Sequence, residues 1–309
     1  MRVAILDLGT NTFNILVSET SPDNRLVVIY TSKEPVKLGK EGIHKGFITE
    51  EAMERGFAAI EKLIEKSRVY KPEKIYAFAT SAIRDASNCK KFVNEVKKRF
   101  GIYIIIIPGE REAEMIYKGV RQSFKANDRP FIVLDIGGGS NEVIIGNKKK
   151  IFWKYSFNIG MARMLEMFPH SDPLTKEEIE KVESFYEKEL QKLYLAVDEF
   201  KPETLIGASG SFETFYALLS HSLPEKYKFD RSQPSHIIEL EDYYNLHKIL
   251  IKSTIEQRSK MPGMELVRVE MIVFATIFVN NILKKGFVKT LIQSDYALKE
   301  GVIAEMLNL

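Results

Sequence analysis

The stretch Phe131–Ile145 combines three consecutive glycines with two carboxylates, a combination that could bind phosphate together with a divalent cation. A β-branched apolar run ends at Asp135, the turn Gly137–Ser140 follows, and Glu142 opens a second apolar run. Backbone N–H groups of successive glycines can approach an anion that side chains would keep away. Carboxylates can hold a divalent cation directly or through water. The pattern predicts strand, tight turn, strand. An ordinary hairpin with a glycine turn is the alternative for this stretch taken alone.

A second copy of the same pattern lies at the N-terminus, displaced by 128 positions (135 minus 7). The aligned pairs are Asp7 with Asp135, Gly9 with Gly137, Thr12 with Ser140 and Asn14 with Glu142. A repeated strand–turn–strand unit predicts two duplicated domains. Two such turns facing each other across a cleft could hold a chain of phosphates from both sides.

Five segments occur in an order that is far more specific than one glycine loop: Asp7–Phe13, Ala79–Asn88, Ile107–Ala113, Asp135–Glu142 and Gly207–Ser211. Together they run over most of the chain. This set resembles the exopolyphosphatase and guanosine pentaphosphate phosphatase family, a branch of the actin, sugar kinase and Hsp70 superfamily. The resemblance implies an α/β fold of two actin-like (ribonuclease H-like) domains with an interdomain cleft. We expect domain I at 1–124 and domain II at 125–294, with a terminal helix at about 295–309 packing back on domain I.

The resemblance also implies the catalytic residues. It assigns the base to Glu112, although Glu110 lies in the same turn and could be mistaken for it. Both glutamates could instead be ordinary first-turn carboxylates that favour the helix dipole. Arg84 could clamp phosphate oxygens bidentately, or form a local ion pair with Asp85.

The ligand-binding candidates fall into two sets. For Mg²⁺, or another divalent cation, they are Asp7, Asp135 and Glu142, which could otherwise cap their turns. For phosphate they are the residues of the two glycine turns and, as secondary candidates, three residues of the fifth segment: Gly9, Thr10, Asn11, Thr12, Gly137, Gly138, Gly139, Ser140, Gly207, Gly210 and Ser211.

Several positions depart from the family pattern. Asn141 replaces a threonine, and Pro108 replaces a serine that could serve as a phosphate donor. Arg268-Val-Glu270 stands where Arg-Ala-Asp is usual, and Ala297 and Lys299 stand where glycine and arginine are common. None of these changes removes a proposed carboxylate, but they leave substrate preference open.

Apolar periodicity and turn residues predict the elements that position these groups. Up to residue 124 the order is β-β-β-α-β-α-β-α, and three strands follow in 130–157. We expect one long helix from a Thr175 cap to about Val197, an irregular segment at 220–240, and helices at about 240–258 and 265–284.

Composition excludes several classes of protein. The 309 residues suit two domains, and a net charge of +3 is too mild for a nucleic-acid-binding domain. The lone Cys89 excludes an internal disulfide framework, and a reducing, cytoplasmic location fits it. We expect neither a signal peptide nor a membrane span, because no run of about 18 apolar residues occurs. The five histidines are scattered, which argues against a zinc site.

The leading hypothesis is a phosphoanhydride hydrolase. It would release terminal phosphate from inorganic polyphosphate, or the 5′ gamma-phosphate of guanosine pentaphosphate, by metal-assisted attack of water. An actin-like small-molecule kinase or ATPase is one alternative, and a non-catalytic sensor of a phosphorylated nucleotide is another. A homodimer is implied by the resemblance alone.

Overall fold

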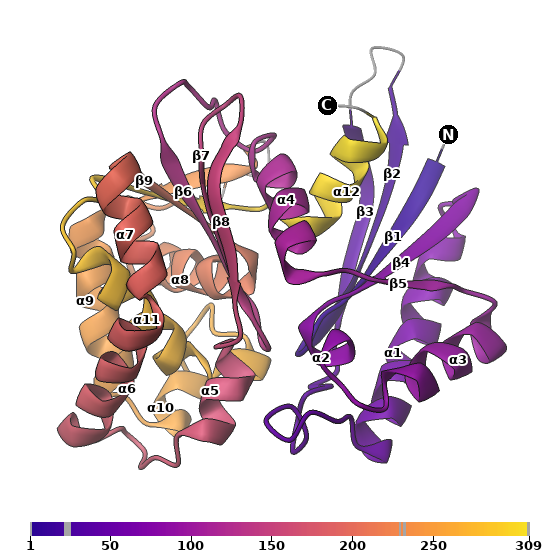
Figure 1. Ribbon diagram of the computed structural model, residues 1–309, viewed down its shortest axis with the longest axis horizontal. Helices are drawn as coiled ribbons and strands as arrows, with labels where there is room; N and C mark the ends of the chain where they lie inside the picture. Colours follow the sequence, from indigo (N-terminus) through magenta and orange to yellow (C-terminus); the bar gives the residue numbers. More distant parts are fainter. Residues whose placement is uncertain (1, 22–25, 229, 231–232, 308–309) are drawn as a thin grey trace.

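The computed structural model describes residues 2–21, 26–228, 230 and 233–307 of the chain. Two β-sheets stand side by side, with helices between them and on their outer faces (Figure 1). The first sheet has the order β3-β2-β1-β4-β5. Its strands are β1 Arg2–Leu8, β2 Thr12–Thr20, β3 Leu26–Pro35, β4 Lys74–Ala79 and β5 Ile104–Ile106.

The second sheet has the order β10-β11-β9-β6-β7-β8. Its strands are β6 Phe131–Ile136, β7 Asn141–Gly146, β8 Ile151–Phe157, β9 Thr204–Ala208, β10 Ser235–Ile238 and β11 Thr290–Ser294. In both sheets the first strand pairs antiparallel with the second and parallel with the strand that follows the first helical crossover, which is α1 in the first half and α5 to α7 in the second. The two halves therefore share one topology.

The strand register confirms the internal repeat. Asp7 lies opposite Asn14 in the first hairpin, and Asp135 lies opposite Glu142 in the second. These pairs are related by the same displacement that aligns the two sequence segments. The sequence similarity thus reflects two equivalent hairpins at equivalent places in two sheets.

The helices form three layers around the two sheets (Figure 1). Helices α1 and α3 cover the outer face of the first sheet, and α4 and α12 lie between the sheets. The other long helices cover the far face of the second sheet. The bounds are α1 Glu50–Arg68, α2 Ser81–Arg84, α3 Cys89–Phe100, α4 Gly109–Val120, α5 Met161–Met167, α6 Lys176–Glu189, α7 Gln191–Phe200, α8 Ser209–Ser222, α9 Leu240–Lys252, α10 Ile255–Ser259, η1 Leu266–Arg268, α11 Ile272–Leu283 and α12 Leu298–Met306.

An apolar layer joins the two halves behind the site. Helix α12 packs against α4 and β1, and both helices bury apolar side chains between the sheets. Ile5 of β1 and Val133 of β6 belong to this one cluster, although they lie in different sheets. Burying each side chain of this size stabilises the folded state by about 1.5–3 kcal/mol. The shared layer therefore fixes the two sheets relative to each other at the end of the cleft.

Four expected elements differ from the structure. The helix expected at about 240–258 is two helices, α9 and α10, because Thr254 caps a new helix. The helix expected at about 265–284 is α-helical only over α11, after the single turn η1. The helix expected from Thr175 to Val197 is two helices, α6 and α7, because the chain turns at Leu190. The turn keeps both Leu190 and Leu193 buried. The segment expected to be irregular contains β10, a four-residue edge strand paired with β11. A strand that short, directly after Pro234, shows too few alternations for periodicity to reveal it.

Candidate active site

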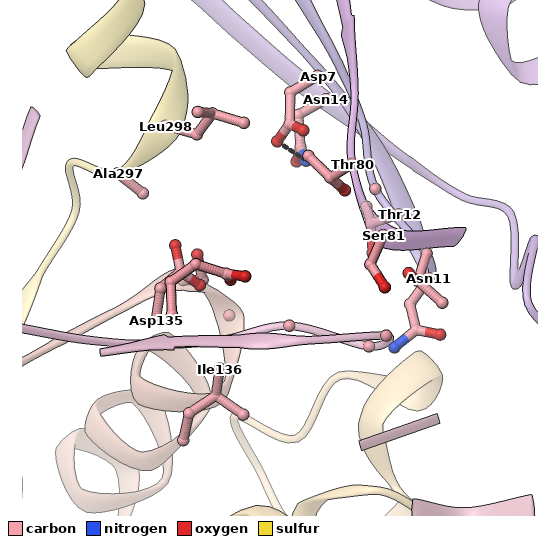
Figure 2. A pocket seen from close by; sticks show the side chains of 18 of the residues that line it. Asp7, Asn11, Thr12, Asn14, Thr80, Ser81, Asp135, Ile136, Ala297 and Leu298 are labelled. Atoms are coloured by element: carbon pink, nitrogen blue, oxygen red, sulfur yellow. Dashed lines mark hydrogen bonds between the residues drawn. The ribbon is translucent and has the colours of Figure 1, made fainter. Parts of the chain in front are cut away.

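The two glycine turns meet across the cleft. A Cβ on Gly138 would lie 2.4 Å from Asn11 Nδ2 and 2.9 Å from Thr10 Cβ, so this glycine allows the second turn to touch the first. Beside the contact lies a cavity of about 120 Å³ between β1 and β6. Figure 2 shows this cavity with Asp7 on one side and Asp135 on the other.

Helix α5 orients the second turn. The first N–H groups of α5 donate to the carbonyls of Gly137 and Gly138 at 2.8–3.2 Å, and the carbonyl of Gly139 accepts from Gly160 and Arg163. The N–H groups of Gly138 and Gly139 have no protein partner within the part of the chain that the structure describes. Because α5 binds the carbonyls of the turn and leaves the N–H groups of Gly138 and Gly139 available, the turn forms a nest that can bind an anion.

The first turn contributes a second polar surface. Gly9 and Gly137 adopt the same turn, since a Cβ on either would lie 2.5–2.8 Å from the carbonyl oxygen three residues later. Thr12 Oγ1 is buried and has no hydrogen-bond partner in the described chain, although Thr12 lines the cavity. A buried hydroxyl without a partner costs free energy. A bound phosphate oxygen or metal-bound water would satisfy it.

The cavity is rich in carboxylates. Its lining has six of them against three basic side chains, in the part of the chain that the structure describes: Asp7, Glu112, Asp135, Glu142, Glu213 and Asp295, with Lys33, Arg268 and Lys299. Asp7 accepts a hydrogen bond from Asn14 Nδ2 at 3.1 Å (Figure 2). Burial raises the pKa of Asp135 to about 6, and the charge of Asp7 acts in the same direction.

Glu142 and Glu112 approach this cluster from two different elements. Glu142 on β7 accepts a hydrogen bond from Ser156 Oγ on β8 at 2.6 Å. Burial and the charge of Asp135 raise the pKa of Glu142. Burial and the charge of Glu142 also raise the pKa of Glu112 well above its usual range, whereas Arg84 acts to lower it.

The structure separates Glu112 from Glu110. Glu112 is 6% exposed and lines the cavity, and Arg84 Nη1 donates to its carboxylate at 2.7 Å. Glu110 is exposed and faces Lys154 at 3.7 Å. Two residues along a helix point in directions about 200° apart. Only Glu112 could therefore act on a group bound in the cavity.

The donor set suits a hydrated divalent cation. Within the described residues, no three His, Cys, Asp or Glu side chains lie close enough together to ligate one metal ion. Mg²⁺ usually keeps several waters and binds through one or two carboxylates plus substrate phosphates. Asp135 and Glu142 are buried, and the cavity carries an excess of carboxylates. These residues, with Asp7 across the cleft, fit a cation held in that way.

Three expected site residues do not line the cavity. Arg84 contacts the lining residue Glu112 but does not itself line the cavity. Gly207 is required for packing, since a Cβ there would lie 2.1 Å from the ring of Phe212. Ser211 is buried at the start of α8. Gly210 does line the cavity, under the guanidinium of Arg268.

Several lining residues were outside the expected set. Lys299, from α12, lies among carboxylates that hold its pKa above the usual range although burial alone would lower it. Ser209 adopts a left-handed conformation (φ 65°) and its hydroxyl hydrogen-bonds Asp135. Lys33, Ser81, Glu213, Arg268 and Asp295 also line the cavity, among other residues. The signals in the sequence were comparisons with the family pattern, at Arg268, which matches its arginine, and at Lys299, where the family commonly has arginine.

Fold and site together define a class of protein. Two α/β domains of actin-like topology enclose a cleft with an anion-binding nest on one side and buried carboxylates around it. The chain matches the model of the Ppx/GppA phosphatase family over residues 16–309. The chain belongs to the Ppx/GppA phosphatase family.

Individual relatives agree with this assignment. An exopolyphosphatase from Cytophaga hutchinsonii superposes with a TM-score of 0.95 at 36% identity, covering 100% of this chain and 98% of that one. The Aquifex aeolicus Ppx/GppA family member superposes with a TM-score of 0.80 at 28% identity, covering 100% and 98%. A bifunctional 3-dehydroquinate synthase/phosphatase from Fusobacterium nucleatum is 33% identical over 91% of this chain. The chain spans 43% of the length of that curated relative.

These similarities support phosphatase activity for the chain. They confirm the expected family and the expected α/β fold of two actin-like domains. In the described residues, no helix is long and apolar enough to cross a membrane.

Proposed function

We propose that the chain is a phosphoanhydride hydrolase that releases terminal phosphate from inorganic polyphosphate, from guanosine pentaphosphate, or from both. Both substrates present a terminal phosphoanhydride, so one site could accept either. Water attacks the terminal phosphorus in line with the bridging oxygen that leaves. The products are orthophosphate and a substrate shortened by one phosphate.

The protein's own groups have separate roles in this proposal. Glu112 positions the attacking water and accepts its proton. The N–H groups of Gly138 and Gly139, with the hydroxyl of Thr12, bind phosphate oxygens. Arg84 holds Glu112 and offers its remaining N–H groups to the terminal phosphate.

A divalent cation, preferably Mg²⁺, is part of the proposal. Asp135 and Glu142, with Asp7, would hold it, and it would offset charge on the transferring phosphoryl group. The excess of carboxylates in the cavity supports this, because an anionic substrate would otherwise be repelled.

One observation carries the proposal: Glu112 is buried against the same small cavity that the two glycine turns enclose. A carboxylate in that position would repel a bound phosphate unless it served the chemistry or faced a cation. The neighbouring Glu110 points away and provides a matched comparison.

The test measures phosphate release from long-chain polyphosphate and from guanosine pentaphosphate, with and without Mg²⁺. Glu112→Gln is compared with Glu110→Gln, which makes the same chemical change in the same helical turn. The hydrolase proposal expects Mg²⁺-dependent release that only E112Q abolishes, with substrate binding retained. The ratio of rates on the two substrates identifies the preferred one.

Two outcomes would replace the proposal. Tight binding of a guanosine polyphosphate by folded protein, without release from either substrate, would indicate a sensor. Consumption of ATP only when a small-molecule acceptor is present would indicate a kinase. The homodimer and the cytoplasmic location stay predictions, which light scattering and fractionation can test.

A further inference from the structure

Arg163 on α5 bridges the two halves of the molecule. Its Nε donates to the carbonyl of Gly139 in the second glycine turn at 3.2 Å. Its Nη1 donates to the carbonyl of Ile43, and its Nη2 to Asp85 Oδ2 at 3.0 Å, both in the first half of the chain. The side chain is 13% exposed. One guanidinium therefore connects the phosphate-binding turn of one half with two segments of the other.

Asp85 connects Arg163 to the expected catalytic pair, Arg84 and Glu112. Its other oxygen, Oδ1, accepts from Arg84 Nε at 3.3 Å, and Arg84 Nη1 donates to Glu112 at 2.7 Å. Ser81, which lines the cavity, donates to Asp85 Oδ2 at 3.1 Å. A continuous series of hydrogen bonds thus runs from α5, through Asp85 and Arg84, to the carboxylate of Glu112.

We propose that Arg163 is a positioning residue that fixes the orientation of Arg84 and Glu112 through Asp85. The proposal rests on the hydrolase function proposed above. Arg163 bonds Asp85 and fixes it. Asp85 then holds Arg84 by Nε, which leaves Nη1 directed at Glu112. Without Arg163, Asp85 lacks this second cation and the pair loses its fixed geometry.

The position of Asp85 explains why loss of Arg163 would matter. Asp85 accepts from two arginines and a serine. Without Arg163, the carboxylate is no longer fixed, so it holds Arg84 Nε less firmly and the guanidinium loses its orientation toward Glu112. A displacement of about 1 Å at a reacting group can reduce turnover about 100-fold. Because Arg163 also bonds the carbonyl of Gly139 in the phosphate-binding turn, its loss should affect KM as well as kcat, and the effect on kcat is the one that depends on Asp85.

The kinetic test is a double-mutant cycle between Arg163→Ala and Asp85→Asn. If Arg163 acts through Asp85, R163A lowers kcat about 10–100-fold, and the double variant is no worse than the more impaired single variant. Arg163→Lys should recover only part of the activity, because one ammonium cannot bond Asp85 and both carbonyls together. Full additivity of R163A with D85N would show that Arg163 does not act through Asp85, and the proposal would be wrong.

Glu166→Ala is the matched control. Glu166 lies one turn along α5 and accepts from the backbone N–H groups of Glu41 and His44, so it also bridges the two halves. It has no contact with Asp85. We expect E166A to leave kcat within about threefold of wild type and to be additive with D85N. If E166A reproduced the effect of R163A, general loosening of the interface would account for both, and the positioning role would be wrong.

A measurement that needs no turnover separates this proposal from the hydrolase function. The Arg84 Nε–H signal, assigned by its absence in Arg84→Lys, reports hydrogen exchange with water by NMR. R163A should accelerate that exchange, and E166A should not. If the Arg84 Nε–H exchanges at the wild-type rate in R163A, Arg163 does not position Arg84 and the proposal is wrong. If wild-type protein releases no phosphate, the hydrolase function is wrong. The exchange rates would still show whether Arg163 positions Arg84.

Discussion

Arg84 and Glu112 form one hydrogen-bonded ion pair, with 2.7 Å between Nη1 and the carboxylate oxygen. The expected phosphate clamp therefore also holds the expected base. Arg84 Nη1 donates further to the carbonyl of Ile107, directly after β5, which holds the guanidinium in place. Substrate phosphate that contacts Arg84 must share it with Glu112. The charge and position of the expected base thus depend on the residue expected to clamp the substrate.

Replacing Arg84 should shift the pH dependence of hydrolysis. Burial raises the pKa of Glu112 and Arg84 opposes that rise, so Arg84→Gln should raise it further. A base must be ionised, so the acid limb of kcat should move to higher pH, and kcat at the optimum should fall about 100-fold. The measurement is a pH–rate profile from about pH 5 to 9 at saturating substrate and Mg²⁺.

Arg111→Gln is the control for this shift. Arg111 lies on the same helix as Glu112, but it pairs with Glu114 and Glu305 away from the cavity. Its loss should leave the acid limb in place. An R84Q profile whose acid limb coincides with that of wild type would show that Arg84 does not set the pKa of the base.

Asp135 should make metal-free protein less stable as pH rises. Its folded pKa is about 6, against 3.8 for the unfolded chain, so the unfolded state ionises first. The favourable contribution is complete below pH 3.8 and is lost as pH rises through 6. One pKa unit corresponds to 1.36 kcal/mol, which gives a loss of about 3 kcal/mol. Asp135→Asn removes this titration.

Urea unfolding in a chelator, at several pH values, measures this effect. The free energy of unfolding of D135N minus that of wild type should increase between about pH 4 and 7. Taking the difference cancels titrating groups that do not interact with Asp135. A constant difference across this range would mean that Asp135 does not bear an unfavourable charge in the folded protein.

A divalent cation should stabilise the protein through the same carboxylates. At 100 times its dissociation constant, a ligand that binds only the folded state adds about 2.7 kcal/mol. Mg²⁺ should therefore raise the Tm of wild type at neutral pH, but not that of D135N or Glu142→Gln. Asp128→Asn changes an exposed carboxylate beside Lys149 and should respond like wild type. Equal increases in all four proteins would place the cation elsewhere.

The hairpins could be predicted because their signals are local. The equivalence of Asp7 and Asp135 can be recognised from the apolar residues of each strand and from the glycine at each turn. Both features are visible within about fifteen residues. The positions of Lys299 and Arg163 could not be predicted in the same way. Each makes its contacts only because segments distant in the sequence pack together: α12 against α4 and β1, and α5 against Ile43 and Asp85. A single basic residue on a helix carries no signal of which neighbour it will meet.

Gly138 should tolerate no side chain, because it lies where the two turns touch. A Cβ there would be 2.4 Å from Asn11 Nδ2 and 2.9 Å from Thr10 Cβ, so Gly138→Ala must push the turns apart. We expect kcat/KM to fall at least about 100-fold, with the Tm reduced by only a few degrees. Asn11→Ala in the same chain removes the nearer obstacle and should restore part of the loss. G138A activity equal to wild type would mean that the cleft works without contact between its two turns.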